Sequence, residues 1–157
     1  MAQAVADYVG ATFIKIGAAD LPNGKPGAVF LTAVFDVAAD FIAKGSSVVL
    51  FIDEIDTVFG RRALQRAGAL AGLWGRFTKG LLVIGATNDP WDIAPKIAAR
   101  LERKILVDSP SDQARASMIR KQLAEEETEP NLSAADIAWV VSVTRGRSAV
   151  ALLGHGE

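Results

Sequence analysis

The run from Ser47 to Asp56, SVVLFIDEID, places an adjacent acidic pair directly after a stretch of apolar residues. The stretch 48–52 predicts a strand that is buried on both faces, as in a parallel sheet. Asp53 and Glu54 follow at its carboxyl end, which is the edge where open parallel sheets bind ligands. One carboxylate there can hold a hydrated Mg²⁺, and the other can polarise an attacking water. An acidic pair after a strand is also typical of a solvated loop or of the cap of the next helix.

A second apolar run favours a shared site over these two alternatives. The segment 81–88, LLVIGATN, predicts another buried strand and ends in the polar Asn88. Because the carboxyl ends of parallel strands meet at one edge of a sheet, we expect Asn88 beside Asp53 and Glu54. Taken alone, Asn88 is also explained as a turn residue before Pro90.

Apolar patterns of alternating period predict an α/β fold with a parallel sheet and helices on its faces. Strands are expected at Thr12–Ile16, 47–53, 81–86 and Ile105–Val107, and helices at Ala2–Val9, Ala28–Ala43, Arg62–Phe77 and around Ile97–Leu101. After Pro110 the pattern predicts helices alone. They are expected at Ser111–Glu125, at Ser133–Val143 with a capping pattern from Ser133 to Asp136, and from Ser148 onward. We therefore predict an α/β domain over residues 1–109 and a helical domain over 110–157.

Composition excludes several classes of protein and of site. The chain has 157 residues, of which 50% are hydrophobic, and a formal net charge of -1. It can bury one core, and it has no overall charge that would attract nucleic acid or an anionic membrane. With no cysteine and one histidine, a disulfide framework and a thiolate or histidine-rich metal site are excluded. No signal peptide and no apolar window of ~20 residues is visible. We expect a cytoplasmic protein with no membrane span and no nucleic-acid partner.

Three motifs together resemble those of a known family. VVLFIDEID resembles the Walker B motif of AAA ATPases, and VIGATNDPW resembles their sensor 1 strand. The segment 88–105, NDPWDIAPKIAARLERKI, is similar to their second region of homology in the Pro-Trp form of the katanin, spastin and Vps4-like (meiotic) group. Thr144, Gly146, Ser148 and Leu152 resemble a segment of the family's small helical lid. The resemblance implies a P-loop NTPase-type sheet flanked by helices and followed by part of an all-helical lid.

The same resemblance implies a role for each matching residue. Asp53 would coordinate Mg²⁺ through water, and Glu54 would orient and activate the attacking water. Asn88 would be sensor 1, in contact with that water or with the γ-phosphate. Arg100 would be an arginine finger that reaches the nucleotide of a neighbouring subunit, although a surface arginine is the alternative. These roles suit phosphoryl transfer, which depends on charge neutralisation and in-line positioning.

The family's cofactors and partners follow from the resemblance in the same way. It implies ATP and Mg²⁺ as cofactors, with Asp53, Gly146 and Ser148 in contact with them. It also implies a homo- or hetero-oligomeric ring that acts on a protein substrate. Asp56, the last acid of the Walker B run, is expected only to cap the helix that follows.

The chain departs from the family pattern in one major respect: it contains no G-x-x-x-x-G-K-[ST] phosphate loop. The segment 1–10 resembles the helix that follows the loop's lysine, so we expect the first strand and the loop to be missing. In this family that strand lies in the middle of the sheet. Its absence is expected to separate Ile105–Val107 from the other strands and to leave apolar edges open. The segment 23–27, NGKPG, is a weak alternative phosphate site, and the family's aromatic pore loop is replaced at 22–27.

Three functions are compatible with these features. The first is an ATP-hydrolysing module of a ring-forming, protein-remodelling AAA ATPase, of which the isolated chain would be impaired. The second is a non-hydrolysing AAA-like subunit that contributes Arg100 to an active neighbour. The third is a DExD-box helicase fragment, which is disfavoured because Gly85-Ala86-Thr87-Asn88 stands where those proteins have Ser-Ala-Thr and because no basic stripe is present.

Overall fold

The computed structural model describes residues 1–22, 25–125 and 133–146. The chain divides into two compact units, Met1–Arg103 and Lys104–Glu157. None of the helices in the described ranges is long and apolar enough to cross a membrane.

The first unit is built on a parallel sheet of three strands. The strands are β1 (Thr12–Ile16), β2 (Val48–Ile52) and β3 (Leu81–Gly85), in the order β1-β2-β3. The register places Ile16 opposite Ile52, and Ile52 opposite Gly85, so the three carboxyl ends are level with one another. β2 is the central strand, and it is buried along most of its length, as its uninterrupted apolar run predicts. The α/β class expected from the sequence is confirmed.

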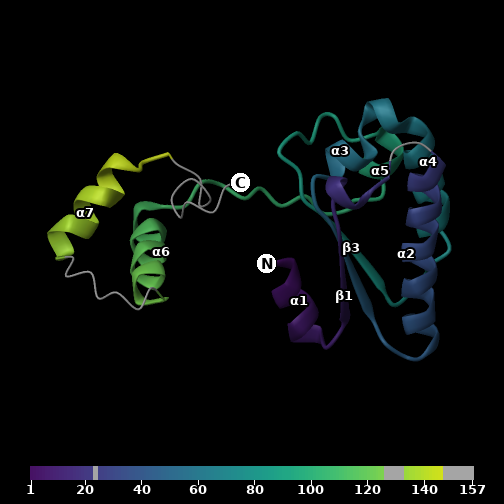
Figure 1. Cartoon of the computed structure of the whole chain (residues 1–157), viewed down its shortest axis with the longest axis horizontal. Helices are drawn as coiled ribbons and strands as arrows, with labels where there is room; N and C mark the ends of the chain where they lie inside the picture. The colour runs from purple at the N-terminus through teal and green to yellow at the C-terminus, as the bar shows by residue number, and fades with distance from the viewer. Residues whose placement is uncertain (23–24, 126–132, 147–157) are drawn as a thin grey trace. The chain divides into compact units, whose positions relative to one another are not determined.

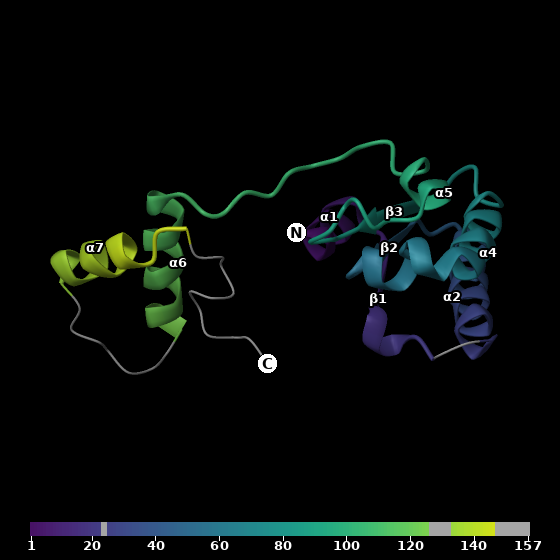
Figure 2. The same cartoon turned by 90° about the horizontal axis from the view of Figure 1, so that it is seen from above.

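Helices cover both faces of this sheet (Figures 1 and 2). Helix α1 (Ala2–Val9) lies on one face, and α2 (Lys25–Ala43) and α4 (Leu64–Trp74) lie on the other. Successive side chains of a strand point to opposite faces, so Leu50 and Ile52 pack with Phe35 of α2 and Leu70 of α4 in the main core. The remaining short elements of this unit are η1 (Ala18–Asp20), α3 (Ile55–Phe59), η2 (Arg61–Ala63) and α5 (Pro95–Ala98).

The strand expected at Ile105–Val107 is wrong, because the structure assigns no strand to these residues. Their side chains are 78%, 84% and 70% exposed. A strand needs a neighbour for its backbone N–H and C=O groups, and within the described residues β3 pairs only with β2. This agrees with the expectation that the segment is separated from the sheet.

The second unit contains two helices, α6 (Asp112–Glu125) and α7 (Ala134–Val143). The capping pattern predicted at Ser133 is confirmed, since its hydroxyl accepts the Asp136 N–H at 3.2 Å and its own N–H donates to the Asp136 carboxylate at 2.8 Å. The third helix expected from Ser148 lies outside the described residues.

A buried arginine joins the two helices of this unit. Arg115 is 2% exposed, and it donates to the Pro110 carbonyl at 2.8 Å, to Asp112 Oδ1 at 2.7 Å and to the Val141 carbonyl at 3.0 Å. The hydrogen bond from Arg115 holds the pKa of Asp112 below its ordinary value of 3.8. Arg115 therefore links α6 to the end of α7 through groups that water would otherwise solvate.

The central position of β2 leads to a stability prediction for two leucines. Leu50 is 0% exposed and Leu82 is 48% exposed. Leu50→Ala should lower the free energy of unfolding by about 2–5 kcal/mol, because it leaves a cavity in the main core. Leu82→Ala should lower it by about 1 kcal/mol or less, since half of that side chain already contacts solvent. Urea denaturation followed by circular dichroism measures both changes, and equal losses would contradict this description of the core.

Candidate functional site

The carboxyl end of β2 is held by backbone hydrogen bonds from both neighbouring strands. On the β1 side, the Asp53 N–H donates to the Ile16 carbonyl at 2.8 Å. On the β3 side, the Ala86 N–H donates to the Ile52 carbonyl at 2.9 Å, and the Ile55 N–H donates to the Ala86 carbonyl at 2.9 Å. The acidic pair is thus fixed at the sheet edge by the strand ends on either side.

Glu54 has an unusual backbone conformation. Its φ is 49° and its ψ is 50°, and it is the only non-glycine residue in the described ranges with a positive φ. This left-handed conformation costs a non-glycine residue on the order of 1 kcal/mol. Helix α3 begins at the next residue, yet the Glu54 side chain makes no capping hydrogen bond and Glu54 is exposed. Its carboxylate is therefore available at the sheet edge.

Asp53 meets a cation within the chain. Its Oδ2 lies 3.2 Å from Lys15 Nζ on β1, and the Asp53 side chain is 41% exposed. In the described parts of the chain, no group of three or more His, Cys, Asp or Glu residues is arranged to hold a metal. A single carboxylate with water and phosphate oxygens is the usual way that proteins hold Mg²⁺. The donor set therefore fits a magnesium ion that is bound together with a nucleotide, and it does not fit an all-protein cage.

Asp56 does not cap the helix, so that prediction is wrong. It lies in the first turn of α3, where its Oδ1 accepts the Thr87 hydroxyl at 2.5 Å. A hydroxyl bonded to an ionised carboxylate forms one of the shorter and stronger hydrogen bonds in proteins. The Asp56 carboxylate is turned toward the end of the neighbouring strand because a donor is available there.

Thr87 in turn anchors the loop that contains Asn88. The Asp89 N–H donates to Thr87 Oγ1 at 2.9 Å, and the Trp91 N–H donates to Asp89 Oδ1 at 3.1 Å. Asn88 lies between these anchored residues and is exposed. The structure therefore brings Asn88 to the same sheet edge as Asp53 and Glu54, on a loop whose backbone is held in place.

Our sequence analysis missed Asp56 and Thr87 as members of this site. The available signal was the presence of a donor and an acceptor at the ends of two strands predicted to be neighbours. Because parallel strands bring such residues together, Thr87 at the end of the 81–86 run and Asp56 after the 47–53 run were candidates for a pair.

Arg100 lies elsewhere in the first unit. It is exposed and follows α5, and its Nη2 is 3.3 Å from the position that a Cβ on Gly75 would occupy, at the end of α4. The ion pairs found among the described residues do not include it. The structure does not bring Arg100 to the acidic pair of its own subunit. Gly146 follows α7 in the second unit with a φ of 77°, and Ser148 lies outside the described residues.

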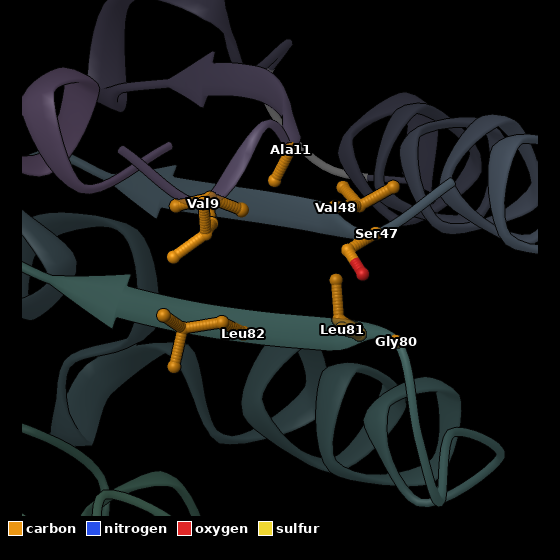
Figure 3. Close-up of a pocket in the computed structure, with 8 residues that line it drawn as sticks. Val9, Ala11, Ser47, Val48, Gly80, Leu81 and Leu82 are labelled. Atoms are coloured by element: carbon orange, nitrogen blue, oxygen red, sulfur yellow. The ribbon is translucent and has the colours of Figure 1, made fainter. Parts of the chain in front are cut away.

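A pocket is present on the first unit, but it does not belong to the acidic site (Figure 3). It is an open, largely apolar hollow of about 220 Å³. The residues that line it are Val9, Ala11, Ser47, Val48, Val49, Gly80, Leu81 and Leu82. These residues lie at the beginnings of β2 and β3, whereas Asp53 and Glu54 follow the end of β2. The pocket and the acidic pair are therefore at opposite ends of the strands.

The left-handed backbone of Glu54 leads to a stability prediction that does not depend on activity. Glu54→Gly and Glu54→Ala both remove the carboxylate, but only glycine adopts a positive φ without strain. We expect Glu54→Gly to be more stable than Glu54→Ala by about 1 kcal/mol in urea denaturation. Thr57, exposed within α3, is the matched control. There the order should reverse, because alanine favours a helix over glycine by about 1 kcal/mol. A more stable alanine at position 54 would contradict the backbone assignment.

Known proteins share both the sequence and the fold. The family model described as ATPase family associated with various cellular activities (AAA) matches residues 1–109. A human katanin p60 ATPase-containing protein of the A-like 1 type is 29% identical over 157 residues, which cover 88% of this chain and 31% of that protein. Vacuolar protein sorting-associated protein 4 of Dictyostelium discoideum is 29% identical over 160 residues, which cover 94% of this chain and 35% of that protein. The chain thus spans about a third of the length of these relatives.

A solved structure matches almost the whole chain. The FIGL-1 AAA domain in complex with ADP superposes with a TM-score of 0.80 and 25% identity, covering 97% of this chain and 52% of that one. The family model, the relatives of the katanin and Vps4 type and the shared fold agree with one another. The chain belongs to the AAA family of ATPases.

Proposed function

We propose that the chain is the ATP-hydrolysing module of a ring-forming, protein-remodelling AAA ATPase, with ATP and Mg²⁺ as its cofactors. The observation that carries the proposal is the placing of Asp53, Glu54 and the Thr87–Asn88 loop at one edge of a parallel sheet. In sheets of this kind that edge is the ligand-binding edge. The likeness to an AAA domain in complex with ADP supports a nucleotide as the ligand.

Asp53 is proposed as the carboxylate that holds the metal. It is half-exposed, and it already holds a cation, Lys15, at 3.2 Å. When bound, Mg²⁺ neutralises the charge that develops on the phosphate oxygens during phosphoryl transfer. The protein contributes a carboxylate whose backbone is hydrogen-bonded to β1, so that its position changes little between turnovers.

Glu54 is proposed as the residue that orients and activates the attacking water. A general base must reach the proton that it removes, so geometry matters before pKa. Its left-handed backbone separates its side chain from the helix that follows, and its carboxylate has no capping partner. The backbone strain at this position is the kind that recurs at active sites.

Asn88 is proposed as the polar contact to the water or to the γ-phosphate. An amide side chain supplies both donors and an acceptor, so it can bind either group. The hydrogen bonds of Thr87 and Asp89 fix the backbone on both sides of it. We infer that Asp56 and Thr87 are positioning residues, because they touch the Asn88 loop rather than the reacting atoms.

Arg100 is proposed to act on the nucleotide of a neighbouring subunit. It is exposed and lies beside the end of α4, and it is not paired with the acidic residues of its own chain. An arginine supplied by a neighbour can neutralise charge on the transferred phosphoryl group. This role requires an oligomer with head-to-tail contacts, which closes into a ring. We propose residues 110–157 as the helical lid of the module, with Gly146 and Ser148 on its nucleotide side.

A second candidate function is a non-hydrolysing AAA subunit that supplies Arg100 to an active neighbour. It is favoured by one feature, the lack of a G-x-x-x-x-G-K-[ST] pattern within these 157 residues. The backbone N–H groups of that loop provide much of the phosphate affinity in proteins that have it.

The hydrolytic proposal predicts the effect of removing one carboxylate in the complete gene product. Glu54→Gln keeps the size of the side chain but removes the base, so Mg-ATP turnover should fall by roughly 10² or more. Asp40→Asn, at an exposed acid on α2, is the matched control and should leave turnover unchanged. An enzyme-coupled phosphate assay measures both. Unchanged turnover in Glu54→Gln would remove Glu54 from the proposed role, and a wild-type protein without turnover would leave the second candidate.

A further inference from the structure

The only ion pair involving the acidic pair in the described residues is made by Lys15. Its Nζ lies 3.2 Å from Asp53 Oδ2, and the two side chains are 58% and 41% exposed. Lys15 is on β1, and Asp53 directly follows β2. A positive charge thus lies at the carboxylate that we propose as the metal ligand.

The sheet geometry directs Lys15 toward this carboxylate. The parallel register places Lys15 opposite Phe51, and residues two apart on a strand share a face. Lys15 Nζ lies 5.9 Å from the centre of the Phe51 ring, within the range of a cation–π contact. Phe13, two residues before Lys15, stacks on Phe51 with ring centres 6.2 Å apart. The two rings line the face along which the Lys15 side chain extends, so the ion pair is a product of the strand pairing.

A second acid lies near this pair but is already engaged. A Cβ on Gly17 would lie 3.7 Å from Asp53 Cβ and 3.8 Å from Asp20 Oδ2. The same Asp20 oxygen accepts the Gly17 N–H at 2.8 Å. Asp20 therefore closes its own turn, and Lys15 makes its ion pair with Asp53.

We propose that Lys15 is an internal counter-ion of Asp53 that a divalent metal must displace before it binds. This inference rests on the proposed function, because it takes Asp53 as the metal-binding carboxylate. An ammonium at 3.2 Å and a divalent cation on the same carboxylate repel each other. Lys15 therefore lowers the affinity of Asp53 for free metal, and metal binding releases the ammonium from the carboxylate.

The size of the effect follows from charge and exposure. The pair is partly exposed, so solvent screens the repulsion. We expect that removing the Lys15 charge raises the affinity of Asp53 for a divalent cation by roughly threefold or more. A residue that only supported the position of Asp53 would have the opposite effect, since its loss would lower the affinity.

The test uses Mn²⁺ as the probe and needs no nucleotide. Bound Mn²⁺ broadens nearby amide signals, so a titration of the ¹⁵N-labelled chain reports binding at residues 52–54. Lys15→Met removes the charge and keeps the length of the side chain. Lys15→Arg keeps the charge. Lys44→Met makes the same change in net charge at an exposed lysine after α2, before β2 begins and so at the other end of that strand from Asp53.

We expect Lys15→Met to reach half-maximal broadening at a Mn²⁺ concentration roughly threefold or more below that of the wild type. Lys15→Arg and Lys44→Met should behave as the wild type does. Adding Asp53→Asn to Lys15→Met should abolish the gain. Equal curves for Lys15→Met and the wild type, or a gain that survives Asp53→Asn, would overturn the inference. Because this readout involves no hydrolysis, failure of the proposed ATPase activity would appear separately, in the Glu54→Gln assay.

Discussion

The hydrogen bonds at the carboxyl end of β2 are the constraint on which the rest of the site depends. Asp53 is held to β1 through Ile16, and the chain on either side of it is held to β3 through Ala86. β2 is also the strand with a neighbour on each side. Because its side chains fill the core on both faces, a shift of its end would require the core to repack. The acidic residues therefore keep a fixed relation to the loop that follows β3.

The site combines this rigid support with two local features that a purely structural chain would avoid. Glu54 adopts a left-handed backbone, and Lys15 places a cation on the neighbouring carboxylate. Each has a cost or a consequence that the surrounding contacts offset: the strand pairing holds Glu54, and the Phe51 ring supports Lys15. Departures from local preference of this kind are concentrated at functional sites. Asp56 and Thr87 add a polar link between the two strand ends.

Most of the fold and part of the site follow from the sequence, for physical reasons that differ between elements. The run at 48–52 is apolar throughout, so it identified a buried central strand, and the capping residues at Ser133 and Asp136 identified the start of α7. Ile105–Val107 has the composition of a strand, but a strand also needs a partner, and composition does not reveal whether one is present. The contacts of Asp56 with Thr87 and of Lys15 with Asp53 depend on strand register, which local patterns do not contain. The backbone of Glu54 was likewise invisible, since its left-handed conformation is imposed by the hydrogen bonds on either side of it.

The central claim is that the acidic pair and Arg100 belong to one catalytic unit shared between subunits. Mixing two inactive variants of the complete gene product tests it most directly: Glu54→Gln lacks the base, and Arg100→Ala lacks the arginine. Each variant alone should have about 1% of wild-type Mg-ATP turnover or less. An equal mixture should recover roughly a quarter of the wild-type rate, because half of the sites keep Glu54 and about half of those face an intact Arg100. A mixture no more active than the two variants alone would contradict the shared site.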